Sequence, residues 1–319
     1  MRCAWRRRGR RAEPDMTVQQ GTVIAVRPRR ARVRADGQEY DCELPQGLIR
    51  GPREQRTLLA VGDRVRFERL PSGGAVVRRL LPRTSKVSRV GSLRPRREQV
   101  IAANLTQLLA LQAVAEPRFN ARALDRLLVV GEAGNLRCAV VLNKIDLSGR
   151  AQITTALTPY RRAGYPILET SALTGEGLER LRGFLQDEVS ILLGPSGVGK
   201  SSLLNRLIPG LTQSTRQISR SSGKGRHATS RVDHLDFPGG GVVLDTPGLR
   251  AVQPWTTAPA LAGCFPEMRD HLDRCRFPDC LHRAEPDCAV RGAVDAGAVD
   301  RQRYEAYLRI LASLLEEAG

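Results

Sequence analysis

The chain has 319 residues, and its 51 Lys and Arg against 33 Asp and Glu give a formal net charge of +18. This length accommodates two or three domains, and no apolar run has the length of a membrane helix or the pattern of a secretory signal. The basic excess favours a nucleic-acid partner over an anionic membrane surface; a merely solvated basic surface is the alternative. Seven cysteines, an odd number, argue against a disulfide scaffold and for a reducing, cytoplasmic setting.

The N-terminal part of the chain predicts a tail and a barrel. Residues 1–16 are rich in arginine and lack apolar periodicity, so we expect a disordered basic tail, with Met16 as a second possible start. Residues 17–83 alternate short strands with turns, which predicts an OB-type β-barrel that binds RNA; a barrel that serves only as a spacer is the alternative. Aromatic residues for base stacking are few (Tyr40 and Phe67), which favours contacts with the RNA backbone.

The rest of the chain predicts an α/β domain over residues 84–253 and a helical, cysteine-containing domain over residues 254–319. Residues 83–97 are expected to form a basic linker. Apolar runs then alternate with helical stretches, the pattern of a parallel sheet covered by helices. The predicted strands of this sheet are residues 107–114, 138–142, 166–170, 189–193 and 242–244.

A phosphate-binding loop follows the predicted strand 189–193. Residues 194–201 match GxxxxGK[ST] and precede a helical stretch, which is the context that this motif requires. Backbone N–H groups and the helix N-terminus would surround the phosphates, with Lys200 on the β- and γ-phosphates and Ser201 on Mg²⁺. A glycine-rich turn without nucleotide is the alternative. The predicted contacts are Gly194, Pro195, Ser196, Gly197, Val198, Gly199, Lys200, Ser201 and Ser202.

An NKxD motif predicts that the nucleotide is a guanine nucleotide. Asn143-Lys144-Ile145-Asp146 ends an apolar strand, and the Asp146 carboxylate can accept from guanine N1–H and the exocyclic amine together. Adenine offers no such pair of donors. Asn143 would tie the base to the phosphate loop and the stem of Lys144 would cover its face. Backbone N–H groups at Ser171 and Ala172 are expected to read guanine O6; the alternative is a coincidental NKxD turn.

A DxxG motif and the segment before it predict a nucleotide-dependent switch. Asp245 would orient Mg²⁺ through water and the Gly248 N–H would sense the γ-phosphate. Residues 213–231 are polar, basic and glycine-containing, and Thr229 is the expected Mg²⁺ ligand there, with Thr215 as the alternative.

The group that positions the attacking water is a separate question. Leu249 stands where many GTPases place a water-orienting glutamine, so another side chain must act. We expect His227 to be catalytic together with Lys200 and Thr229; a surface histidine without a catalytic part is the alternative.

The order of these motifs is unusual, because NKxD precedes the phosphate loop, whereas in an ordinary small GTPase it follows. Both motifs are well formed, so we interpret the α/β domain as a circularly permuted P-loop GTPase domain. After it, Cys275, Cys280, His282 and Cys288 form the pattern C-x4-C-x-H-x5-C, which predicts one structural Zn²⁺. His271 is a substitute ligand, and unpaired core cysteines are the alternative.

These features together resemble the circularly permuted, ribosome small-subunit-dependent GTPase A of bacteria. The resemblance covers nearly the whole chain after Met16 and includes residues 102–104 (AAN) and 223–229 (GKGRHAT). Thr106, Pro195 and Ala228 depart from the residues usual in that family. Gly197 stands where potassium-dependent GTPases keep Asn, which leaves a potassium requirement open.

The resemblance implies a GTP/GDP-binding hydrolase, with Mg²⁺, that is stimulated by the 30S ribosomal subunit. It also implies an OB-fold that docks on 16S rRNA, a zinc module that contacts the subunit, and a late role in maturing the small subunit. We expect a monomer with no membrane partner. The alternatives are an rRNA-binding scaffold that holds GTP as a structural ligand, and a GTPase that acts at a membrane or on a protein.

Overall fold

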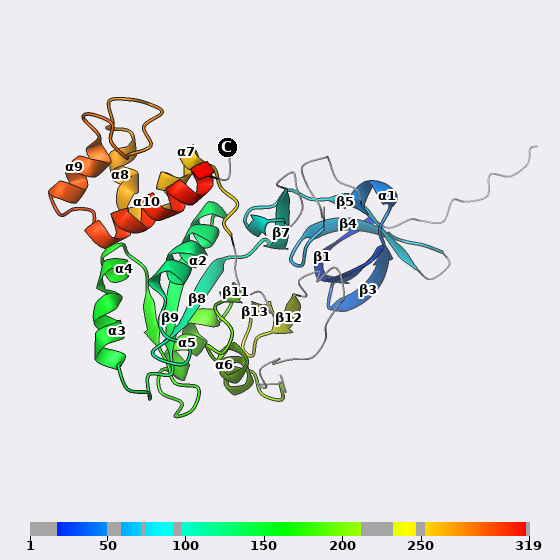
Figure 1. The fold of residues 1–319 in the computed structure, drawn as a ribbon. Helices are drawn as coiled ribbons and strands as arrows, with labels where there is room; N and C mark the ends of the chain where they lie inside the picture. The colour runs from blue at the N-terminus through cyan, green and yellow to red at the C-terminus, as the bar shows by residue number, and fades with distance from the viewer. Residues whose placement is uncertain are drawn as a thin grey trace, which may run out of the picture.

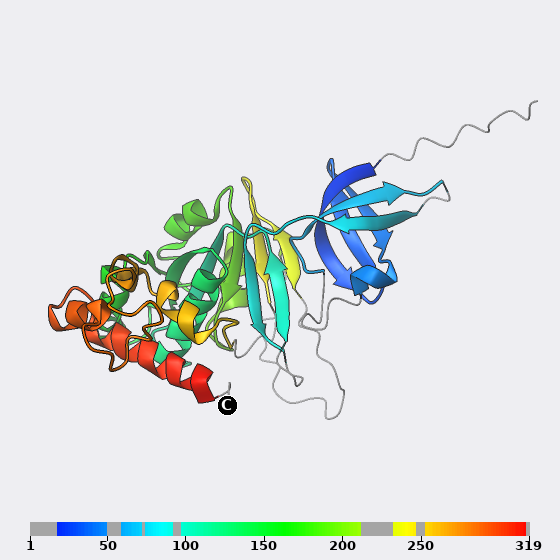
Figure 2. The same cartoon turned by 90° about the horizontal axis from the view of Figure 1, so that it is seen from above.

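The computed structural model describes residues 18–49, 59–71, 74–91, 97–211, 232–246 and 253–316. A barrel lies at one end of the molecule, a six-stranded sheet in the middle and a group of helices at the other end (Figures 1 and 2). Within these ranges, no helix has the length and apolar character needed to span a membrane. The predicted N-terminal tail of residues 1–16 lies outside the described residues.

The N-terminal region is a closed five-stranded β-barrel with strand order β1-β2-β3-β5-β4, which confirms the predicted barrel. Neighbouring strands are antiparallel except for the parallel pair β3 and β5. Alternate side chains fill the interior because successive residues of a strand point to opposite faces. Its elements are β1 (Val18–Arg27), β2 (Arg30–Ala35), β3 (Gln38–Glu43), α1 (Gln46–Ile49), β4 (Arg64–Arg69) and β5 (Ala75–Leu80).

The two aromatic residues of the barrel are not both available for base stacking. Phe67 is 0% exposed inside the barrel. Tyr40 packs against it with ring centroids 5.0 Å apart, and the Arg69 guanidinium lies over the Tyr40 ring at 5.6 Å from its centroid. Phe67 therefore belongs to the core and is not available for base stacking.

The segment predicted as a basic linker contains a strand. β6 (Lys86–Val90) pairs antiparallel with β7 (Glu98–Ala103) in a separate two-stranded sheet between the barrel and the central sheet. Val87 is fully buried in the main core, while Lys86 forms an ion pair of 2.6 Å with Glu98. The chain that leaves the central sheet returns here, because Pro254 forms a β-bridge with Arg89. The charged residues of this strand, Lys86 and Arg89, made the segment look like a linker in the sequence.

The central sheet has the order β10-β9-β8-β11-β13-β12. All neighbours are parallel except β12 and β13, which are antiparallel, so β12 is an edge strand. The five strands predicted here are confirmed, and β12 was not predicted. The strands are β8 (Gln107–Ala113), β9 (Arg137–Asn143), β10 (Ile167–Glu169), β11 (Val189–Leu193), β12 (Asp233–Asp236) and β13 (Val242–Asp245).

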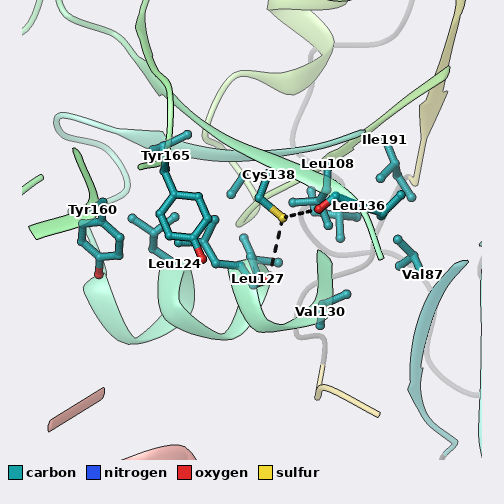
Figure 3. Close-up of a cluster of buried hydrophobic side chains, with 14 of the residues drawn as sticks. Val87, Leu108, Leu124, Leu127, Val130, Leu136, Cys138, Tyr160, Tyr165 and Ile191 are labelled. Atoms are coloured by element: carbon teal, nitrogen blue, oxygen red, sulfur yellow. Dashed lines mark hydrogen bonds between the residues drawn. The ribbon is translucent and has the colours of Figure 1, made fainter. Parts of the chain in front are cut away.

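Helices cover both faces of the sheet, as a doubly wound α/β fold requires. On one face, α2 packs its apolar stripe on the sheet, and Leu124, Leu127 and Val130 face Leu108 and Cys138 (Figure 3). On the other face, α5 and α6 bury their leucines against the alternate residues of the strands, whose side chains point to that face. The helices are α2 (Ala121–Ala133), α3 (Arg150–Ala156), α4 (Thr158–Arg162), α5 (Leu178–Leu185) and α6 (Lys200–Leu207).

The C-terminal region is helical, as predicted, and packs on α2. Its helices are α7 (Ala258–Leu261), α8 (Arg269–Leu272), α9 (Ala289–Asp295) and α10 (Arg301–Glu316), with short 3₁₀ turns at Ala262–Cys264 and Pro266–Met268. Arg303 of α10 is 2% exposed and donates to Asp125 of α2 at 2.8 Å and to Glu267 at 2.7 Å. The rings of Tyr160 and Phe265 face its guanidinium at 4.9 and 4.8 Å. A buried ionic network thus joins this region to the sheet.

Candidate functional site

The phosphate loop lies between the buried end of β11 and the first residue of α6. Gly197 and Gly199 have φ of +82° and +96°, in the region that favours glycine. A Cβ on Gly194 would lie 2.6 Å from the Leu111 carbonyl oxygen, so only glycine fits between the loop and β8. The glycines of the motif therefore serve the backbone path of the loop, which turns just before the helix N-terminus.

Lys200 lies inside the loop. Its Nζ donates to the carbonyl oxygens of Gly194 at 2.7 Å and Pro195 at 3.2 Å. Burial lowers the pKa of Lys200, and the nearby carboxylate of Asp245 opposes that change. Asp245 ends β13 and is opposite Leu192 of the neighbouring β11. The sheet register thus brings the DxxG aspartate, which is 3% exposed, next to the lysine of the phosphate loop.

Asn143 joins the NKxD motif to the phosphate loop. It ends β9, is 1% exposed, and its Nδ2 donates to the Val198 carbonyl oxygen at 2.9 Å. A Cβ on Gly199 would lie 2.3 Å from the same Nδ2, so this contact needs a glycine in the loop. Asn143 and Val198 are 55 positions apart in the chain, and the NKxD motif precedes the phosphate loop, which reverses the usual order. The sheet nevertheless assembles them into one site.

The loop that follows β10 supports Asn143 from the other side. The Asn143 Oδ1 accepts from the Ala172 N–H at 3.2 Å and from the Thr170 hydroxyl at 3.3 Å. The Ser171 N–H donates to the Glu176 carbonyl oxygen at 2.9 Å. These N–H groups hold the site together, and their predicted contact with guanine O6 stays a prediction. Sequence reasoning missed Thr170, although a polar residue at the end of a buried strand was a signal for it.

The remaining NKxD side chains are also held in place. The Asp146 carboxylate accepts from the Ser171 hydroxyl. Lys144 has φ of +61°, and its Nζ donates to the Glu116 carbonyl oxygen, so its stem is fixed beside the loop that follows β8. Ser171 is fully buried, which sets the direction of the Asp146 carboxylate. Ser171 therefore orients the carboxylate that was predicted to recognise guanine.

The predicted switch lies outside the described residues. It comprises Thr215, His227, Thr229, Gly248 and Leu249, within residues 212–231 and 247–252. Their roles stay predictions. The described residues on either side are Leu211, just after α6, and Val232, just before β12.

The predicted zinc ligands come together in the loops between α8 and α9 (Figure 1). One ligand atom from each of Cys275, Cys280, His282 and Cys288 lies within 4.8 Å of the others, and His271 is not part of this cluster. The His282 Nδ1 is 3.4 Å from the sulfurs of both Cys275 and Cys288, which are 4.0 Å apart. Zinc bonds of about 2.3 Å to sulfur and about 2.0 Å to nitrogen give tetrahedral edges of roughly 3.5–3.8 Å. The cluster therefore fits a tetrahedral ion.

Neighbouring groups shape the loop that carries the cluster. Tyr304 and Tyr307 of α10 donate their hydroxyls to the carbonyl oxygens of His282 and Leu281, both at 2.7 Å. The Glu285 carboxylate accepts from the N–H groups of Leu281, Arg283 and Ala284. Burial raises the pKa of Glu285, but the hydrogen bonds from the backbone outweigh burial and leave the pKa below its ordinary value. The last helix thus positions the imidazole through the backbone.

Comparison with known proteins agrees with this geometry. The sequence profile of the RsgA GTPase family matches residues 80–255. The "Small ribosomal subunit biogenesis GTPase RsgA" of Gemmatimonas aurantiaca is 45% identical over 282 residues, which are 88% of this chain and 92% of that protein. The protein of the same name from Shewanella oneidensis is 37% identical over 311 residues, which are 94% of this chain and 84% of that protein.

Solved structures share the fold. The crystal structure of YjeQ from Thermotoga maritima matches with a TM-score of 0.72 and 31% identity, over 94% of this chain and 99% of that one. YloQ, described as a circularly permuted GTPase, has a similar fold with a TM-score of 0.69 and 24% identity, over 97% of this chain and 98% of that one. With a profile match over more than half its length and a relative 45% identical over 88% of it, the chain belongs to the RsgA GTPase family.

Proposed function

We propose that this GTPase acts in the biogenesis of the small ribosomal subunit, and that contact with the 30S subunit and its 16S rRNA stimulates hydrolysis. The curated relatives carry small-subunit biogenesis in their name. The net charge of +18 supports an RNA partner, since lysine and arginine neutralise phosphates. The protein would work in the cytoplasm, where the ribosome is built, as a monomer.

The observation that carries the nucleotide assignment is the hydrogen bond from Asn143 to Val198. It fixes the guanine-reading motif against the phosphate loop, so that the base and the phosphates of one nucleotide can be held together. Asp146, aligned by Ser171, then supplies two acceptor oxygens to the paired donors of guanine. Adenine offers no such pair of donors, so the carboxylate would keep only its hydrogen bond from Ser171 and two charge-assisted hydrogen bonds to the base would be lost, at a cost of roughly several kcal/mol.

Hydrolysis would use residues on both sides of the phosphates. When bound, Mg²⁺ neutralises charge on the β- and γ-phosphates. Ser201 and Thr229 are the residues that would hold it, and Asp245 would orient its water. Lys200 would stabilise the transferring phosphoryl group, and His227 would position the attacking water once the subunit orders the switch.

The cysteine cluster would hold one structural zinc ion. Three thiolates and one imidazole complete a tetrahedron and leave no open position, so the site is suited to structure and not to catalysis. Its loops have few helices of their own, and the ion would take the place of a larger core. The module it forms is proposed to contact the subunit.

Turnover measured with and without purified small subunits tests the proposal. We expect strong stimulation in the wild type. His227→Ala should lower the stimulated rate by about 10²–10⁴-fold, the usual range for a lost general base, and leave GTP affinity nearly unchanged. An unstimulated wild-type protein would contradict the proposal. Normal stimulated turnover in His227→Ala would remove the catalytic role of this residue, and negligible hydrolysis under all conditions would favour the rRNA-binding scaffold.

A further inference from the structure

The outward arginines of the barrel differ from one face to another in their acidic partners. On the hairpin β2–β3, every outward arginine faces a carboxylate. The ion pairs are Arg30 with Asp41 at 2.6 Å, Arg34 with Glu39 at 3.0 Å, Arg32 with Glu39 at 3.5 Å and Arg30 with Glu43 at 3.4 Å. Arg34 also pairs with Asp236 of β12 at 2.5 Å. This face carries as many acids as bases on its two strands.

The adjoining pair β4–β5 carries five arginines and one glutamate. The glutamate, Glu68, is 4% exposed and accepts from Arg78 at 2.5 Å. Arg69 is exposed and lies over the Tyr40 ring, with no ion pair to an acid among the described residues. In the same part of the chain, Arg64, Arg66 and Arg79 likewise have no acidic partner, and all three are exposed. We call these three the β4–β5 arginine patch. Together with Arg69, it forms the part of the surface of these two strands whose charge no acid neutralises among the described residues.

A β-bulge places Arg79 in this patch. Ala75 and Val77 of β5 point into the barrel, so strict alternation would send Arg79 inward as well. The register shifts between Arg66 and Phe67, so that Val65 faces Leu80 and Arg66 faces Arg79. Leu80 then packs against the barrel core and Arg79 turns outward. Bulges commonly redirect a side chain beside a functional site.

The resulting arrangement costs stability in the free protein. Arg66 and Arg79 are direct cross-strand neighbours, and like charges in that position repel each other. A polyanion bound across the two strands would convert this repulsion into attraction. The patch also borders a groove between the barrel and the central domain, lined by Arg79, Arg83, Lys86 and Asn135.

We propose that the β4–β5 arginine patch, and not the β2–β3 hairpin, is the surface of the barrel that contacts the phosphate backbone of rRNA. This inference rests on the proposed function, because it assumes a small-subunit partner. Many OB-folds bind nucleic acid across strands β2 and β3. Here the charges of that face are neutralised within the protein. With Phe67 buried and Tyr40 beneath Arg69, the described residues of the barrel offer no stacking platform near the patch, so recognition is through phosphates and not through bases.

A pair of matched double variants tests the proposal in the full chain. Arg66→Gln/Arg79→Gln removes two charges of the patch, and Arg30→Gln/Arg32→Gln removes two charges of the hairpin. The affinity of each variant for purified small subunits and for protein-free 16S rRNA is measured across a range of salt concentrations. Loss of two phosphate contacts should reduce the slope of log affinity against log salt by about 1.4–1.8, at about 0.7–0.9 per contact. The hairpin variant should change this slope less.

Thermal unfolding separates a binding role from a structural one. Removing the repelling pair should leave the unfolding temperature of Arg66→Gln/Arg79→Gln unchanged or raise it, while its affinity for rRNA falls. If the hairpin variant loses as much affinity as the patch variant, or if the patch variant binds rRNA like the wild type, the assignment of the face is wrong. If the patch variant loses affinity for subunits but not for protein-free rRNA, the partner is a ribosomal protein, which also overturns it. A wild type that binds neither contradicts the proposed function itself.

Discussion

The nucleotide site and the cysteine cluster bring their residues together in different ways. Asn143 and Val198 are 55 positions apart and meet because parallel strands end at the same edge of the sheet. The four residues of the cluster lie between positions 275 and 288, in loops with short helices on either side. A site built on a sheet tolerates a change in chain order. A site built in loops would depend on the proposed ion and on the helix beside it.

Removal of a cluster ligand should give the largest difference between the two sites. Structural zinc contributes on the order of 10 kcal/mol to the folding of small zinc modules, so we expect Cys288→Ser to lose the ion and the ordered structure between α8 and α9. GTP affinity should stay within about twofold, because the sheet holds that site independently. Metal content, hydrogen exchange and nucleotide titration measure the three quantities.

Cys264→Ala provides the matched control for that experiment, since Cys264 is buried in the same core but lies outside the cluster. It should retain the ion. Full order between α8 and α9 in metal-free Cys288→Ser would show that the loops do not depend on zinc.

Arg303 joins the C-terminal helices to α2 of the central domain, and its loss should have the next largest effect. Arg303→Ala leaves Glu267 buried without a cation and leaves Asp125 with Arg309, at 3.6 Å, as its remaining cation, which should lower the free energy of unfolding by about 3–5 kcal/mol. Denaturant titration measures it. A variant in which Arg303→Met is combined with Asp125→Asn and Glu267→Gln should recover most of the loss, because no uncompensated charge remains. Equal stability of Arg303→Ala and the wild type would mean that the network does not join the regions.

Asp146→Asn should have a smaller effect, confined to the nucleotide site. The amide offers one acceptor where guanine needs two, so GTP affinity should fall by about 100-fold, or roughly 2.7 kcal/mol. The same amide suits xanthine, which presents a donor and an acceptor, so xanthosine triphosphate should gain affinity. Calorimetry measures both, with the exposed Asp270→Asn as the control. Undiminished GTP binding would refute the role of Asp146.

The comparison also explains how much could be predicted from the sequence. The five parallel strands have continuous apolar runs, and each motif sits at a strand end where its chemistry requires it. β12 (Asp233–Asp236) was missed because this short, half-buried edge strand has a single apolar residue, Leu235, and so no apolar pattern. β6 was missed because its charged residues suggested a solvated linker. In the structure Lys86 instead forms an ion pair with Glu98 of the neighbouring strand β7.

Other features depend on contacts that no local pattern contains. Arg303 follows the same charged periodicity as a surface arginine, yet it is buried because Asp125, 178 positions earlier, meets it. The outward direction of Arg79 depends on a bulge that simple alternation does not predict. The sequence motifs therefore identify the nucleotide site and the cluster, while the links between regions require the three-dimensional structure.

The β-bridge between Arg89 and Pro254 determines how the parts of the permuted chain are connected. Asp245 ends β13 near Lys200 of the phosphate loop, and residues 247–252 separate Thr246 from Gln253, whose carbonyl oxygen accepts a hydrogen bond from the Val90 N–H. In this order, β13 is followed closely in the sequence by a segment that pairs with β6, in the hairpin that leads from the barrel. The chain then continues into the C-terminal helices. The barrel and the C-terminal helices are thus both connected, through β6, to the chain that follows β13.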